Sequence, residues 1–242
     1  MCSWILGLLA ATAIVAAPVI ASASSLQIMP INIEVPAPGA ASTVTLINSG
    51  EDTLNAQIRI FKWIQRNGKD ELVPTKDVVT SPPAVKLEPG KKSVIRVVRL
   101  GKVPASAEET YRLIVDEVPK PLKPGQAGVG FSVRHSIPVF FSKPGQDVDL
   151  TWQAALVKGK LVLQADNAGG RRIRLASLAV MNGTGKTIRI GEGLAGYVLG
   201  QSSKQWTVNG ASKTIAAGGT IKITAQGDNG PIEATAKVVA AN

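Results

Sequence analysis

The sequence predicts an all-β protein made of two consecutive β-sandwich domains. Apolar and polar residues alternate through short segments, and turn signals separate these segments about every ten residues, which is typical of β-sandwiches. No segment has the apolar spacing of a long amphipathic helix. The chain has 242 residues, of which 45% are hydrophobic, and this is enough for two domains of roughly 100 residues each.

The N-terminal segment predicts a secretory signal peptide at 1–23. An apolar run that begins at Trp4 is followed by Pro18 and by the small-residue triplet 21–23, the usual layout of a cleavage site. The alternative is an uncleaved membrane anchor, which the proline and the triplet disfavour. Cleavage removes Cys2, the only cysteine, so hydrophobic burial has to hold the exported chain together. We expect a periplasmic protein with no stable membrane insertion.

The first domain is predicted to span 24–142. Asn67-Gly68 predicts a two-residue hairpin turn, because both residues tolerate positive φ. Segment 119–127 is rich in proline and glycine and predicts a loop, and Pro144-Gly145 predicts a break after the domain. Strands are expected within STVTLIN (42–48), NAQIRIFKWIQ (55–65), KLEPGKKSVIRVVRL (86–100, after a Pro-Gly turn), TYRLIVDEV (110–118) and AGVGFSVRHSIPVFF (127–141).

The second domain is predicted to span 143–242. It repeats the pattern of short β segments with glycine-rich turns between them. The segments are LTWQAALVKGKLVLQADN (150–167), RIRLASLAVM (172–181), TIRIGEGLAGYVLG (187–200), KTIAAGGTIKITAQGDNG (213–230) and IEATAKVVA (232–240).

Two glycine-rich motifs lack the context that nucleotide binding needs. GEGLAG (191–196) matches the dinucleotide-binding pattern, but the following segment is a poor helix former, and no acidic residue lies between Glu192 and Asp228. NGTGKT (182–187) lacks the first glycine of a phosphate-binding loop. Both are interpreted as turns between strands.

Catalysis, metal binding and nucleic-acid binding are not expected. His135 is the only histidine, so any catalytic triad would depend on it. No residues have the spacing of a zinc site, and the acidic pair in 147–149 does not make a calcium site. The net charge is +10, but lysines and arginines are scattered with few aromatic residues beside them. We expect no enzyme, no cofactor and no metal, and partners that are acidic or anionic.

Four stretches of the first domain carry a more specific pattern: VTLINSGED (44–52), VTSPPAVKLEPGKKSVIRVVR (79–99), ETYRLIVDEVPKP (109–121) and IPVFFSKPG (137–145). In these stretches the chain resembles the periplasmic pilus-assembly chaperones, especially their archaic branch. The second domain is similar more weakly, through YVLG (197–200) and GDNGPI (227–232). The resemblance implies two immunoglobulin-like β-sandwich domains joined at an angle.

The resemblance also implies a function. Members of this family bind pilus (fimbrial) subunits, which are incomplete sandwiches, by lending them a strand, and deliver them to an outer-membrane usher. Val129, Phe131 and Val133 share one face of the strand before the domain boundary, and the resemblance makes this the donor strand. The alternative is a secreted β-sandwich adhesin or ligand-binding module whose edge strand binds nothing.

The better-known branch of this family anchors the subunit's terminal carboxylate with an arginine and a lysine. Asn32 and Pro138 hold those places here. We expect Arg112 to replace them, because it interrupts an apolar strand that should pair with the donor strand and because guanidinium groups bind carboxylates through paired hydrogen bonds. Arg134 and His135, on the donor strand itself, are the rivals. The alternative to a carboxylate anchor is that the side chain of Arg112 only extends from the wall of the sandwich to place its charge in water.

The resemblance further implies an ion network between the two domains. In the family this network consists of an acidic residue, a basic residue and an aspartate of the second domain. The corresponding residues here are Glu117, Lys143 and Asp228. We expect these groups to fix the angle between the domains. The alternative is three solvated charges that contribute less than about 1 kcal/mol each.

The signal peptide gives the first testable prediction. Because the small-residue triplet ends at Ala23, N-terminal sequencing of the exported protein should begin at Ser24. Recovery of the full-length chain from the inner membrane would contradict the assignment.

Overall fold

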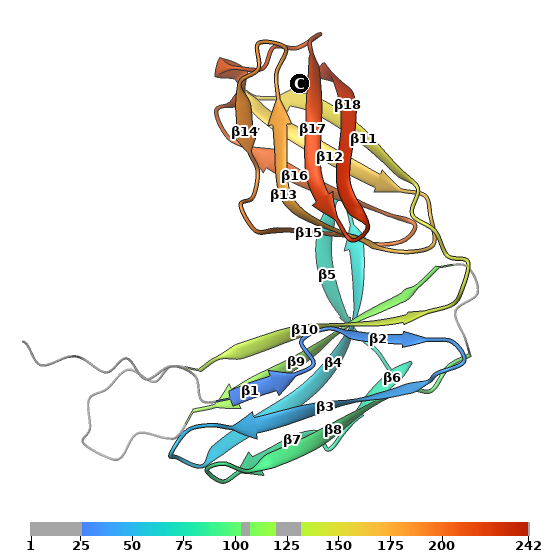
Figure 1. The fold of residues 1–242 in the computed structure, drawn as a ribbon, viewed down its shortest axis with the longest axis vertical. Coiled ribbons are helices and arrows are strands. Elements are labelled where there is room, and N and C mark those ends of the chain that lie inside the picture. Colours follow the sequence, from blue (N-terminus) through green and yellow to red (C-terminus); the bar gives the residue numbers. More distant parts are fainter. Residues whose placement is uncertain (1–25, 103–106, 120–131, 242) are drawn as a thin grey trace, which may run out of the picture.

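Two β-sandwiches meet at an angle in the computed structural model, which describes residues 26–102, 107–119 and 132–241 (Figure 1). The predicted all-β fold class is confirmed, since the described part of the chain is strands and turns with one short 3-10 helix, η1 (Ala211–Lys213). The predicted signal peptide, Val129 and Phe131 lie outside the described residues.

The first sandwich has a small and a large sheet. The small sheet has the order β1 (Leu26–Met29), β3 (Ala41–Asn48), β8 (Lys92–Arg99) and β6 (Val78–Ser81). The large sheet has the order β2 (Ile33–Pro36), β10 (Arg134–Ser142), β9 (Glu109–Val118), β4 (Leu54–Arg66) and β5 (Lys69–Pro74), and β7 (Ala84–Leu87) also pairs with β4.

The core of the first sandwich lies between these two sheets. Alternate residues of each strand point inward, as the period of two in a strand requires. Leu46 of β3 and Ile95 of β8 are fully buried and face the large sheet, from which Leu113 and Val115 of β9 enter the same cluster. The alternation that predicted these strands is therefore the alternation that forms the core.

The second sandwich is one continuous curled sheet. Its order is β14 (Thr187–Arg189), β13 (Ile173–Met181), β17 (Thr220–Gly227), β18 (Gly230–Ala241), β11 (Leu150–Val157), β12 (Lys160–Asn167) and β16 (Ser202–Val208), and β15 (Leu194–Val198) also pairs with β13. The long strand β18 pairs with β17 up to Lys237 and with β11 from Val238 onward. One strand thereby joins both faces around a second core.

The hairpin of β4 and β5 reaches from the first sandwich to the second (Figure 1). Its turn residues Asn67 and Gly68 have φ values of 52° and 72°, which confirms the predicted hairpin turn. The carbonyl oxygen of Gly68 accepts a hydrogen bond of 2.9 Å from the backbone N–H of Gln205 on β16. A Cβ atom at Gly68 would lie 2.5 Å from Cγ of Gln205. This position therefore needs glycine both because its φ is positive and because there is no room for a side chain beside Gln205.

A pair of glycine substitutions separates these two reasons. Gly90 also has a positive φ, of 70°, but a Cβ there would meet nothing within 4 Å. Gly90→Ala should lose roughly 1 kcal/mol of unfolding free energy from backbone strain alone. Gly68→Ala should lose more in urea denaturation and should also widen the distribution of domain angles in small-angle scattering. Equal losses in both variants, with unchanged scattering, would show that the turn does not hold the second sandwich.

Candidate functional site

The outer edge of β10 is only partly covered. β9 pairs with residues 134–141 of β10, from Arg134 opposite Asp116 to Phe141 opposite Glu109. This confirms the predicted pairing of these two strands. On the other side, β2 runs parallel to β10 and covers only its last four residues, 139–142. Among the described residues, no strand pairs with the outer edge of 134–138, so this is the part of β10 to which another chain could add a strand.

The side chains of β10 divide between two environments. Ile137, Val139 and Phe141 belong to the core of the first sandwich. Val133, just before the strand, is an even number of residues away from these three and is half-buried. Phe140 points the other way, toward the second sandwich. β10 therefore forms one wall of the space between the two domains.

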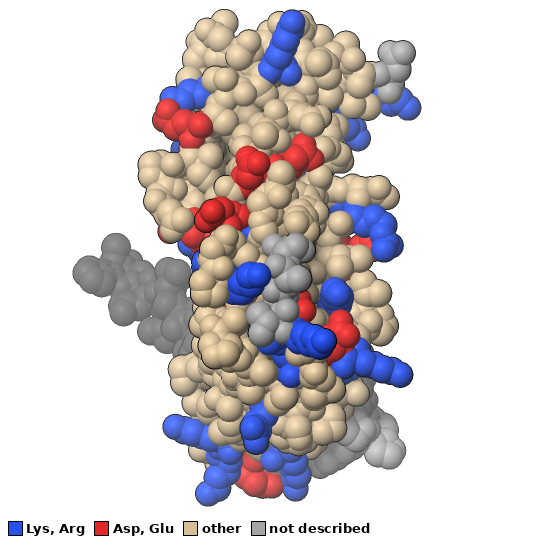
Figure 2. Space-filling view, turned by 90° about the vertical axis from the view of Figure 1, so that its right-hand side faces the viewer, with Lys and Arg blue, Asp and Glu red and all other residues tan. Residues whose placement is uncertain are grey.

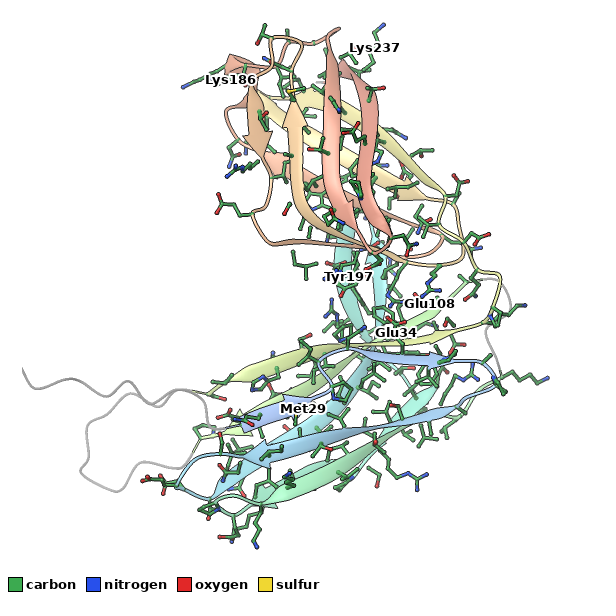
Figure 3. All side chains as sticks on the ribbon, viewed as in Figure 1. Met29, Glu34, Glu108, Lys186, Tyr197 and Lys237 are labelled. Carbon is green, nitrogen blue, oxygen red and sulfur yellow. The ribbon has the colours of Figure 1, made fainter. Side chains whose placement is uncertain are left out.

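That space is a cleft with a volume of about 510 Å³. Figure 3 shows Tyr197, on the second sandwich, above Glu34 at the joint with the first. The open edge of β10 continues directly into the cleft, because Ser136 and Pro138 belong to both. The cleft is lined by Ile31, Asn32, Glu34, Arg112, Ser136, Pro138, Arg172, Arg174, Leu194, Tyr197 and Asp228.

Arg112 lies in this cleft as a cation that makes no ion pair among the described residues, although the charge of Asp70 acts on it electrostatically. Arg112 is on β9, opposite Pro138 of β10. Its guanidinium carbon is 3.7 Å from the ring centroid of Trp63 and 5.8 Å from that of Tyr197. Burial lowers the pKa of Arg112, but a guanidinium stays protonated at neutral pH. Within the described part of the chain it has no hydrogen bond or ion pair to a carboxylate. An incoming anion would relieve the cost of this half-buried charge.

The other two arginines of the cleft are already paired. Arg174 bonds Asp228 at 3.1 Å, and Arg172 pairs with Glu34. Arg112 is therefore the cleft arginine that is available to an added carboxylate, within the residues that the structure describes.

The two rival anchors lie farther along β10 and have partners. Arg134 donates a hydrogen bond of 2.5 Å to Asp116, which also receives one of 2.5 Å from Arg59. Burial raises the pKa of Asp116, but these two guanidinium groups outweigh it and hold the pKa below its usual value. His135 lies 3.7 Å from Glu117. Neither side chain lines the cleft.

Two of the three residues predicted to form an interdomain network lie at opposite ends of β10. Glu117 lies beside His135 and Val133 at the start of β10. Lys143 follows the end of β10, roughly 30 Å away at the rise of a β-strand. Asp228 is in the second sandwich with Arg174. The structure does not bring these three charges together.

The charges that do join the two sandwiches are centred on Arg172. Its guanidinium bonds both Glu34 and Glu108, and its carbon lies 3.4 Å from the ring centroid of Phe140. Glu108 also accepts a bond of 3.4 Å from the backbone N–H of Arg172. Burial raises the pKa of Glu108, and the nearby guanidinium opposes this only in part. No sequence pattern predicted this group of charges; the only signal is the arginine pair that follows Gly169 and Gly170.

Aromatic packing and amide hydrogen bonds complete the joint. Trp63 and Phe140 of the first sandwich form one buried cluster with Leu199 and Tyr197 of the second. The amide of Gln65 donates to the carbonyl of Tyr197 at 2.7 Å and accepts from the N–H of Leu199 at 3.0 Å. The cleft therefore has walls that are fixed relative to each other.

Other kinds of site have no support in the described residues. The described residues contain no cluster of three side chains that could hold a metal ion. They also contain no helix that is long and apolar enough to cross a membrane. Figure 2 shows lysines and arginines spread over one side of the molecule with acidic residues between them.

The comparison with protein families gives a match over residues 25–145, half of the chain, to the pili and flagellar-assembly chaperones, PapD N-terminal domain. The chain belongs to this pilus-assembly chaperone family, and the resemblance stated from the sequence is confirmed. A search of curated proteins found no matching relative.

Solved structures show the same fold. One similar chain is in the CsuC–CsuE chaperone–tip adhesion subunit pre-assembly complex from archaic chaperone-usher Csu pili of Acinetobacter baumannii. It is 26% identical, with 90% of this chain and 99% of that chain covered and a TM-score of 0.67. The Salmonella enterica SafA pilin–SafB chaperone complex gives 20% identity, 88% and 97% coverage and a TM-score of 0.60. The E. coli chaperone DraB is 20% identical, with 87% of this chain and 95% of that chain covered and a TM-score of 0.57. These likenesses confirm the predicted fold of two immunoglobulin-like domains.

The joint predicts that Arg172 and Arg174 differ strongly in their effect on stability. Arg172→Met leaves the buried carboxylate of Glu108 without its cation, which should cost about 3 kcal/mol of unfolding free energy in urea denaturation. Arg174→Met removes an exposed pair and should cost less than about 1 kcal/mol. Adding Glu108→Gln to Arg172→Met should recover part of the loss. Similar losses from both single variants would show that the buried pair does not hold the domains.

Proposed function

We propose that this member of the pilus-assembly chaperone family works in the periplasm, where it holds pilus subunits by donor-strand complementation and passes them to an outer-membrane usher. The observation that carries the proposal is the edge of β10 at 134–138, which no strand of the described residues covers and which leads into a cleft where Arg112 has no ion pair with any described residue. The binding energy would come from backbone pairing and hydrophobic burial, without ATP, cofactor or catalysis.

The donated side chains would be Val129, Phe131 and Val133. In the sequence they have the same parity as Ile137 and Val139, which face the core of the first sandwich. A subunit that lacks its last strand would then be completed by residues in line with the chaperone's own core. Burying each of these side chains in the subunit's groove would contribute about 1.5–3 kcal/mol.

The direction of the bound strand follows from β2. A strand that pairs with 134–138 lies in line with β2, which begins at Ile33 opposite Val139, so it has to end there. If it runs parallel to β10, its carboxyl end arrives beside Asn32 and Pro138, next to Arg112. If it runs antiparallel, its cationic amino end would meet the same guanidinium. Charge therefore favours the parallel strand with a free terminal carboxylate.

Arg112 is well suited to anchor that carboxylate. Trp63 holds its guanidinium plane in place, and Trp63 itself donates a hydrogen bond of 3.2 Å to Asp70. A guanidinium that is already oriented loses little conformational entropy when it forms two bonds to a carboxylate. Arg134 would have to give up its bond to Asp116 to do the same.

The donor strand is tested by a charge on one face. Phe131→Asp should place an unpaired carboxylate in the subunit's groove, at a cost of several kcal/mol, and should abolish co-purification with a co-expressed subunit. Ser132→Asp introduces the same charge on the other face and should retain binding. The melting temperatures of both variants should match the parent, since an unfolded Phe131→Asp would indicate an ordinary core strand. Unchanged subunit recovery by Phe131→Asp would rule out this donor strand.

The anchor is tested by comparing two arginines. Arg112→Ala should reduce subunit recovery at least tenfold, because the terminal carboxylate would enter the cleft without a cation. Arg134→Ala should bind nearly as the parent does, since its charge is paired outside the cleft. Circular dichroism would check that both variants remain folded. Normal binding by Arg112→Ala together with loss by Arg134→Ala would move the anchor to the donor strand.

A further inference from the structure

Two exposed apolar side chains line the cleft from opposite domains. Ile31, in the loop between β1 and β2, is 78% exposed, and Leu194, at the start of β15, is 59% exposed. Ile31 is the most exposed large hydrophobic side chain in the described part of the chain. Both belong to the same cleft as Arg112. Two water-exposed apolar side chains that line one cleft suggest a ligand group that covers them.

We propose that Ile31 and Leu194 form a subsite that selects an apolar side chain on the C-terminal residue of the bound chain. This inference rests on the proposed function, in which Arg112 holds the terminal carboxylate. The Cα atom of a terminal residue is one bond from its carboxylate, so its side chain has to lie within a few ångströms of Arg112. Ile31 lies two residues before the start of β2, near the point where the added strand ends, and Leu194 lines the same cleft from the second sandwich.

The charges around the subsite favour an apolar residue over a charged one. The pairs Arg174–Asp228 and Arg172–Glu34 leave Arg112 as the cleft cation without a carboxylate among the described residues. A terminal lysine or arginine would be repelled by this cation, and a terminal aspartate or glutamate would bring two anions to one cation. An apolar side chain adds no charge and buries Ile31 and Leu194.

The subsite needs both domains. Ile31 comes from the first sandwich and Leu194 from the second, and the buried contact of Arg172 with Glu108 fixes the distance between them. Neither domain alone would give the second wall.

Short peptides test the subsite in the intact chain. The probes are acetyl-Val-Thr-Val-Leu and acetyl-Val-Thr-Val-Ser with free carboxylates, and the leucine peptide as its amide. Methyl NMR of isoleucine- and leucine-labelled protein can follow binding up to millimolar concentrations. The leucine peptide should shift the Ile31 and Leu194 methyl signals and bind roughly tenfold more tightly than the serine peptide.

Matched variants separate the subsite from the anchor. Leu194→Ser should remove the preference for leucine over serine and keep the preference for carboxylate over amide. Leu100→Ser, the same change at a 64% exposed site outside the cleft, should leave both preferences intact. Arg112→Gln should remove the carboxylate preference alone.

Each contrary outcome has a definite meaning. Equal binding of the leucine and serine peptides, or no shift at Ile31 and Leu194 with any peptide, would overturn the subsite. Equal binding of the leucine peptide and its amide would overturn the Arg112 anchor of the proposed function and leave the subsite standing. A dimer in sedimentation that Leu194→Ser dissolves would assign the apolar pair to a second copy of this chain and would also overturn the subsite.

Discussion

The buried contact of Arg172 with Glu108 is the interaction on which the rest of the site depends. It joins residues that are 64 positions apart and belong to different sandwiches, and Phe140 stacks beneath the guanidinium. Two desolvated charges are costly unless they meet in good geometry, so the pair favours one arrangement of the domains over the alternatives. Without a fixed arrangement, Arg112 on one domain and Tyr197 on the other would not face the same cleft.

A second constraint comes from how little of β10 the strand β2 covers. Had β2 been five residues longer at its start, it would have closed the edge at 134–138 and left no place for another chain. Because β2 begins at Ile33, it instead sets the point at which an added strand must end. In the proposed complex, the fold would thus determine the register of a bound strand from its terminus, and backbone pairing alone would not do so.

The sequence predicted the strands well where one face of a strand is buried and the other is exposed. It predicted the Asn67-Gly68 turn because the tolerance of positive φ is a property of these two residues alone. Alternation is lost in β10, where residues 137–141 are all buried, because this strand packs on the core on one side and on the second sandwich on the other. Glu108 and Arg172 were missed for a related reason: their pairing depends on the angle between two domains, which no local pattern encodes. Arg112 could be singled out because a charged residue inside an apolar strand contradicts the local pattern.

These features together suggest how one chaperone could hold subunits of different sequence and still hold them in one register. Hydrogen bonds along β10 involve backbone atoms, so they tolerate almost any partner sequence and fix no register by themselves. A carboxylate occurs once in the backbone of a chain, at its end, and Arg112 offers the cleft's unpaired charge to it, among the described residues. In the proposed complex, anchoring that single group would fix the position of every preceding residue, including those opposite the proposed donor strand. Specificity would therefore depend on the end of the subunit and on the side chain beside it, while most of the contact area stays tolerant.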